Sequence, residues 1–173
     1  MKSLVSWIDS LSEWLGKLVS WLSLILVLTI IIDVTLRYAF NIAFVATFEL
    51  EWHLFALIFL LGAAWALKED RHVRVDVFYQ KFTIKQKAWV NLIGFLMLLL
   101  PMCFVIVREG AQFTYNSFSV LESSSDPGGL PARYIIKAAL PLGFFMLGLQ
   151  SIVEIFKNLT TIFIDGNQQE QDN

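Results

Sequence analysis

Four long apolar segments dominate the chain, and polar residues gather between them. The segments cover residues 18–40, 48–67, 88–107 and 134–156. As α-helices they are each long enough to cross a hydrocarbon core of about 30 Å. None of them alternates between apolar and polar residues as barrel strands do. Because lipid forces backbone groups to pair within a segment, the pattern predicts a single all-α membrane domain with four transmembrane helices.

The segment before the first span has a different pattern. Apolar residues in 1–17, among them Trp7 and Trp14, recur at spacings of three and four, and Ser, Asp, Glu and Lys occupy the other positions. This pattern predicts an amphipathic helix in the membrane interface, with both indole rings at headgroup depth. Alternatively, the segment extends the first transmembrane helix into water. The polar residues 165–173 predict a disordered tail.

The distribution of basic residues predicts the topology. The link 41–47 has no charge, and the link 108–133 balances its two arginines with acidic residues, whereas 68–87 is strongly basic. Basic short loops stay in the cytoplasm, so 68–87 and both termini are expected there and 108–133 outside. Together with Trp7 and Trp14, the candidates for lipid-headgroup contact are Lys68, Arg71, Lys81, Lys85 and Lys87.

Charged residues inside the spans need partners because bare charge is costly in lipid. Asp33 and Arg37 are four residues apart and can pair on one helix face. Glu49, Trp52 and His53 stand near the outer start of the second span, where they could bond to a neighbouring helix or a partner subunit. A solvated helix entry and ion or substrate coordination are the alternatives. Arg133 and Lys137 share a face at the outer entrance of the fourth span and complete the set of subunit-interface candidates; lipid headgroups are their alternative partners.

Composition and motifs give no basis for catalysis. Apolar residues make up 57% of the chain and charged residues 16%, with a net charge of −2 that offers no basis for nucleic-acid binding. Cys103, the one cysteine, lies in an apolar run and is expected to be a small buried hydrophobe. Phosphate-loop, zinc-protease and serine-hydrolase motifs are absent from the sequence. We expect no enzyme activity, no metal and no cofactor.

Three blocks of sequence resemble one transporter family. The block ELEWHLF at 49–55, followed by LGAA at 61–64, resembles the second helix of the small membrane subunit of tripartite ATP-independent periplasmic (TRAP) transporters. The block HVRVDVFY at 72–79 resembles that family's cytoplasmic signature, here His72, Arg74 and Asp76. The block DPGGLPAR at 126–133 is similar to the branch labelled mannitol/chloroaromatic compound transport.

The resemblance implies a non-catalytic subunit of a sodium-driven symporter in the bacterial inner membrane. In such systems a periplasmic binding protein delivers an organic acid to a large multi-helix subunit that works by an elevator mechanism. The small subunit is expected to brace the fixed scaffold of the large one and to help dock the binding protein. The length, turn residues and outward side of 108–133 make Glu122 and Asp126 docking candidates.

Two other classes of function remain open from the sequence. An autonomous four-helix exporter would need an exposed intramembrane carboxylate, for which Asp33 is the candidate. A membrane anchor of a respiratory complex would bind haem, which two histidines can ligate. His53 and His72 fall in a span and in a loop, so they are poorly placed to ligate one haem together.

Overall fold

The computed structural model describes residues 2–69 and 82–169, with side chains in 5–69 and 82–163. The described elements are α1 (Lys2–Phe40), α2 (Val45–Lys68), α4 (Ile84–Gly94), the π-helical turn η1 (Phe95–Leu99), α5 (Leu100–Ser119) and α6 (Tyr134–Gln169). α4, η1 and α5 form one continuous helix. The described residues therefore hold four helices long and apolar enough to span a membrane, as the sequence predicts.

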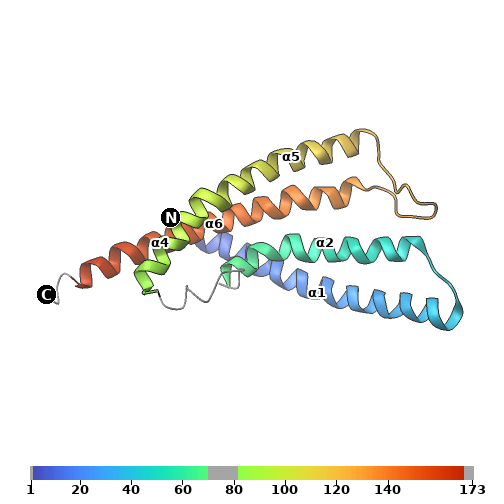
Figure 1. Ribbon diagram of the computed structural model, residues 1–173, viewed down its shortest axis with the longest axis horizontal. Coiled ribbons are helices and arrows are strands. Elements are labelled where there is room, and N and C mark those ends of the chain that lie inside the picture. The colour runs from blue at the N-terminus through green and yellow to red at the C-terminus, as the bar shows by residue number, and fades with distance from the viewer. Residues whose placement is uncertain (1, 70–81, 170–173) are drawn as a thin grey trace.

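The four long helices lie in a row rather than in a closed bundle. α2 packs between α1 and α6, and α5 packs on α6, while α5 has no comparable contact with α1 or α2 among the described residues. Figure 1 shows the two hairpins, α1–α2 and α5–α6, with both linking segments at one end of the molecule. We call this end, formed by 41–44 and 120–133, the loop end. The opposite end, where α1 starts and α6 finishes, is the terminal end.

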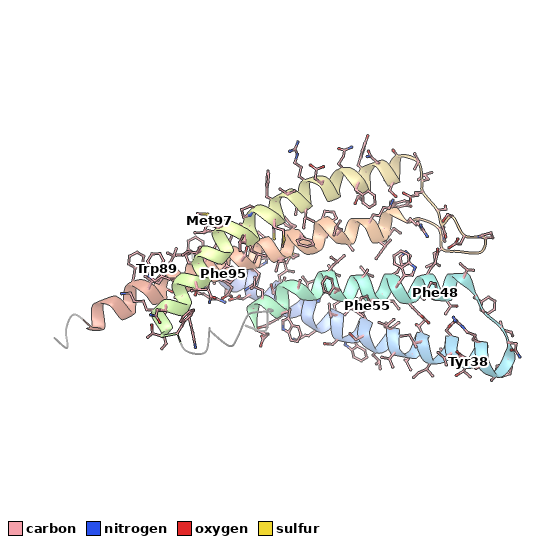
Figure 2. All side chains as sticks on the ribbon, in the orientation of Figure 1. Tyr38, Phe48, Phe55, Trp89, Phe95 and Met97 are labelled. Atoms are coloured by element: carbon pink, nitrogen blue, oxygen red, sulfur yellow. The ribbon has the colours of Figure 1, made fainter. Side chains whose placement is uncertain are left out.

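The core lies where α4, η1 and α5 cross α6. Its buried residues include Leu92, Phe95 and Cys103 on one side and Leu147 and Ile155 on the other. Cys103 is 3% exposed, as expected of a buried hydrophobe. Elsewhere large apolar side chains face outward, among them Tyr38, Phe55 and Met97 at 80%, 62% and 71% exposure (Figure 2). Such an arrangement suits a protein whose solvent is lipid or another membrane subunit.

The interfacial helix predicted for 1–17 is not a separate element. α1 continues unbroken from Lys2 to Phe40, so the segment 2–17 extends the first transmembrane helix. Gly16 lies inside this helix and makes room for the Trp65 ring, whose nearest carbon would lie 2.7 Å from a Cβ there. Ile8 and Leu15 are buried, whereas Trp7 and Trp14 are 63% and 58% exposed. The amphipathic start of α1 therefore packs one face within the chain and exposes its tryptophans on the other face.

The outer loop is shorter than the predicted 108–133, because α5 extends to Ser119. Gly110 permits close packing on α6, since a Cβ there would lie 3.2 Å from the Pro141 ring. Leu121 then adopts a left-handed φ of 48° and the Glu122 amide bonds the Ser117 carbonyl, which closes the helix end. The sequence alone did not reveal this extension because 108–119 owes its helix to packing on α6.

Three further helix boundaries differ from the prediction. α2 spans 45–68 rather than 48–67, and α4 begins at Ile84 rather than at 88. At α4, Thr83 and Gln86 form a capping box, a sequence signal that marks the true start. α6 continues past 156 to Gln169, so helix covers the first part of the tail predicted to be disordered, and 170–173 lie outside the described residues.

Pro101 follows a widened helical turn. Its ring has no N–H, and the preceding turn η1 uses an i to i−5 bond in which the Leu100 amide donates to the Phe95 carbonyl. Figure 1 shows the helix axis changing direction where α4 meets α5. The change of direction before Pro101 therefore coincides with a π-turn.

Candidate functional site

The loop end is organised around one buried carboxylate, Glu49 of α2, which is 2% exposed. Its oxygens accept hydrogen bonds from the Ser124 hydroxyl at 2.5 Å, the Leu130 amide at 2.6 Å and the Arg133 guanidinium at 2.9 Å. These donors are 75, 81 and 84 residues away along the chain. We call Glu49 and its three donors the loop clamp, because it ties the outer loop to α2.

The loop is shaped to meet this carboxylate. Asp126 to Gly129 form a turn in which the Gly129 amide donates to the Asp126 carbonyl at 3.0 Å, with Gly128 at a positive φ of 82°. A Cβ at Gly129 would lie 2.8 Å from Glu49 Oε2. Glycine is therefore required at this position so that the carboxylate can reach the loop backbone.

A second ion pair holds the other side of the loop. The Lys137 ammonium of α6 binds the Glu122 carboxylate and lies 4.2 Å from the centre of the Phe113 ring. The Lys137 ammonium holds the pKa of the Glu122 carboxyl below its ordinary value. Glu122 is thus already paired within the chain, whereas Asp126 at the tip of the turn is exposed.

The remaining interface candidates lie on α1 and α2. Asp33, 4% exposed, pairs with Arg37 at 2.5 Å, as the spacing predicts. Oε1 of Glu51 is buried without a hydrogen-bond partner. His53 Nδ1 lies 2.5 Å from the Glu49 carbonyl, and its ring stacks on Trp52 at 3.8 Å between centroids. Trp52 is 38% exposed, so part of its ring is open to a neighbour.

The terminal end has a polar network that joins α1 to α6. Gln150 is fully buried; its amide nitrogen donates to Asp9 at 3.0 Å and to Glu154 at 3.1 Å. Its amide oxygen accepts from Ser12 at 2.8 Å. The Lys157 ammonium binds Glu154 at 2.8 Å and Asp9 at 3.2 Å. All these groups have partners, so the network stabilises the crossing of α1 and α6.

Lys68 connects α1 and α2 beside this network. Its ammonium binds Glu13 at 2.5 Å and the Asp9 carbonyl at 3.2 Å, and its side chain is only 13% exposed. Lys68 was predicted to meet lipid headgroups, but the structure directs it to α1 because Glu13 and the Asp9 carbonyl lie within its reach. Lys85 is exposed on the first turn of α4 and Lys87 is partly exposed. Arg71, Lys81 and the signature residues His72, Arg74 and Asp76 lie outside the described residues.

Sequence reasoning found the ionic residues of the loop end but not how they pair. Glu49 was expected to bond to a neighbouring helix or a partner subunit, whereas its donors lie in the chain's own outer loop. Ser124, Leu130 and Gly129 were not singled out as its partners, and neither were Asp9, Ser12, Gln150 and Lys157 at the terminal end. The signal for the last group was Gln150, a polar residue in an apolar span that requires partners.

The described residues contain no group of three His, Cys, Asp or Glu that could hold a metal ion. The arrangement is made of paired charges and apolar outer faces, which suits binding between helices.

Residues 6–161 match the family described as tripartite ATP-independent periplasmic transporters, DctQ component. The chain belongs to this family. A protein of Haemophilus influenzae named as a TRAP transporter small permease is 32% identical over 165 residues, covering 94% of each chain. The ectoine TRAP transporter small permease protein TeaB of Halomonas elongata is 25% identical over 166 residues, covering 93% of this chain and 82% of TeaB. None of these descriptions names the mannitol/chloroaromatic branch, which stays a prediction.

Proposed function

We propose that this DctQ-family chain is the non-catalytic small membrane subunit of a sodium-driven TRAP transporter that imports an organic acid across the bacterial inner membrane. The family match over residues 6–161 carries the proposal. The proposed partners are a large multi-helix membrane subunit and a periplasmic substrate-binding protein. α1 starts and α6 finishes at the terminal end (Figure 1), which accords with both termini in the cytoplasm.

The proposed role in the membrane is to brace the scaffold of the large elevator-type subunit. The described helices form a row rather than a closed bundle, so we assign the solute path to the large subunit. The apolar side chains exposed along α1, α2, α5 and α6 offer surface for that subunit and for lipid. Trp52 and Arg37, both partly exposed, are the interface candidates still available to a partner.

The proposed role outside the membrane is to help dock the binding protein at the loop end. The loop clamp and the Lys137–Glu122 pair hold the loop in one shape, which lowers the entropy lost when a partner binds. The exposed groups of this loop include Asp126 and the apolar Val120 and Leu121, the last two at 71% and 66% exposure. Since Glu122 is already paired, Asp126 is the stronger docking candidate.

The terminal end is proposed to lie at the inner surface of the membrane. Trp7 and Trp14 are exposed on one face of α1, and Lys85 is exposed at the start of α4. Such groups suit the headgroup region, where indole rings and amines are favoured.

The test is deletion of the gene in a host that keeps the large subunit and the binding protein. Sodium-dependent uptake of the organic acid should be lost and should return with a plasmid copy, while the affinity of the soluble binding protein stays unchanged. Uptake at the wild-type rate by the large subunit alone would overturn the proposal, as would purification from native membranes without any multi-helix partner.

A further inference from the structure

The edge helix α1 has one face that the described part of the chain leaves uncovered. α1 lies at one edge of the row and packs on α2 and α6 through its other face, where Ile8, Leu15 and Val19 are buried (Figure 1). Eight exposed residues follow the uncovered face at alternating spacings of three and four. We call them the α1 seam: Trp7, Ser10, Trp14, Lys17, Trp21, Leu24, Leu28 and Ile31.

The spacing of the α1 seam is that of a heptad repeat. Alternating steps of three and four residues have a mean of 3.5, the spacing with which one helix packs along another in a left-handed supercoil. The seam runs from residue 7 to residue 31, which is about 36 Å along the helix. It is therefore long enough for a partner helix that crosses a hydrocarbon core of about 30 Å.

The headgroup region of the membrane does not account for the whole seam. Trp7 and Trp14 lie near the start of α1 and suit that region. Trp21 lies about 21 Å further along the helix than Trp7, whereas the interfacial region on each side of the core is only about 5–8 Å thick. Trp21 is 67% exposed and falls within the apolar run 18–40. Because hydrocarbon chains offer no acceptor to its indole N–H, a protein partner suits this part of the seam better than lipid does.

Lys17 gives the seam a positive charge between two tryptophans. It is exposed, and no salt bridge to it exists within the described residues. Glu13, four residues earlier, is within helical reach of Lys17, but its carboxylate binds Lys68 at 2.5 Å. Lys17 directly precedes the apolar run 18–40, where a charge requires a partner. The seam is therefore complementary to a helix with a carboxylate at this depth.

A second copy of the chain fits the seam poorly. Two copies inserted in the same orientation can pair α1 only in parallel, so each seam residue meets itself across a two-fold axis. Lys17 would then face Lys17 of the other copy, and three layers of paired tryptophans would be overpacked. The partner that fits is a different helix, with small side chains opposite the tryptophans and a carboxylate opposite Lys17.

We propose that the α1 seam is the docking surface for one long helix of the large membrane subunit. Small side chains of that helix receive the Trp14 and Trp21 rings, and one of its carboxylates binds Lys17. This inference rests on the proposed function, because it takes the large subunit as the partner, and it assigns that subunit to the α1 edge of the row. The loop clamp and the outer loop stay free for the binding protein.

Photo-crosslinking in native membranes tests where the partner helix lies. A benzophenone amino acid placed at Leu28 lies in the seam, whereas the same group at Ile30, which is also exposed, lies on the opposite side of α1. Ultraviolet light should link the Leu28 position to the large subunit and should not link the Ile30 position to it. Equal yields at the two positions, an adduct with a second copy of this chain or the absence of any protein adduct would overturn the proposal.

Charge reversal tests the carboxylate opposite Lys17. Lys17→Glu should reduce the amount of large subunit that co-purifies with the tagged chain about tenfold, because a hydrogen bond between charged groups is worth about that factor. Arg108→Glu is the matched control, since the Arg108 side chain is 76% exposed on α5, away from the seam, and this variant should recover wild-type amounts. Equal recovery in the two variants would contradict the assigned carboxylate. The Leu28 crosslink decides the docking surface even if Lys17→Glu fails to fold.

The wild type separates this inference from the proposed function. If the large subunit co-purifies with the wild type while the Leu28 position gives no adduct with it, the seam is not the docking surface and the proposed function stands. If no large subunit co-purifies with the wild type, both are overturned.

Discussion

Glu49 is a charged residue near the start of a membrane-spanning helix, and it stays buried because three donors from one loop surround it. Glu51, two residues later, shows the contrast: one of its carboxylate oxygens is buried with no hydrogen-bond partner. Two glutamates on the same helix thus have opposite environments. The difference lies in the outer loop, which reaches one carboxylate and not the other.

We expect Glu49→Gln to release the outer loop, because the neutral amide no longer balances Arg133 and offers a weaker acceptor to the Leu130 amide. Hydrogen–deuterium exchange of the segment 122–133 should become about tenfold faster. Glu51→Gln is the matched control and should leave this exchange at the wild-type rate. Equal exchange in the two variants would contradict the loop clamp.

The Glu122 pair predicts how stability depends on pH. Because the folded pKa of Glu122 lies below its ordinary value of 4.5, the pair stabilises the fold above that value. The stabilisation is lost as the pH falls through the folded pKa. Melting temperatures between about pH 7 and pH 3 should therefore converge for the wild type and Glu122→Gln, with the wild type higher at neutral pH.

The control for this measurement is Glu109→Gln. The side chain of Glu109 is 68% exposed and lies 3.9 Å from an equally open Arg108, so its loss should change little at any pH. A constant gap between the wild type and Glu122→Gln across the whole range would show that the carboxylate charge has no part in the contact.

At the scale of elements, helix ends are set by local hydrogen bonds and helix extensions by packing. The α4 start depends on the Thr83 hydroxyl, which accepts from the Gln86 amide at 3.3 Å, and on the Gln86 side chain, which accepts from the Thr83 amide at 2.9 Å. The extension of α5 to Ser119 depends instead on the α6 surface next to Gly110. Close approach of α2 and α6 depends on Gly143, where a Cβ would lie 2.7 Å from the Leu60 carbonyl oxygen.

We expect Thr83→Ala to fray the first turn of α4 and to cost about 1 kcal/mol, the usual loss for a missing N-cap. Faster hydrogen exchange in residues 84–88 and a lower melting temperature in detergent would report it. Thr29→Ala is the control, because Thr29 lies inside α1 and its hydroxyl only bonds the Ile25 carbonyl at 2.9 Å. Similar losses in both variants would show that the cap has no special role.

At the scale of the whole molecule, the two ends differ in what they present. The loop end is closed by ion pairs around a shaped loop, and the terminal end has the buried Gln150 network. Between them, large apolar side chains are exposed along α1, α2, α5 and α6. The outermost helices of the row, α1 and α5, have few contacts with each other. A partner subunit that packs along the row would therefore stabilise the fold considerably.

The predicted orientation can be tested with single cysteines in a Cys103→Ala background. Ser125→Cys at the loop end should react with a membrane-impermeant maleimide in intact spheroplasts, whereas Lys85→Cys should react only after permeabilisation. Both positions are exposed, so access and not burial decides the result. The reverse pattern would place the loop end in the cytoplasm and exclude docking of a periplasmic protein there.

The amino-acid sequence by itself determined that this protein is helical, spans a membrane and has four spans, because segments of 20 or more predominantly apolar residues leave few alternatives in lipid. It also determined local contacts such as Asp33 with Arg37, which depend only on spacing along one helix. Blocks of characteristic residues were sufficient to indicate the family.

Only the tertiary structure decided which distant groups meet. Glu49 and Arg133 are 84 residues apart, and Lys157 and Asp9 are 148 residues apart. No periodicity along the chain relates such positions. The row of helices, the continuation of α1 through its amphipathic start and the helical state of 108–119 were decided in the same way. Each depends on how one helix surface fits another, and that fit exists only after the chain has folded.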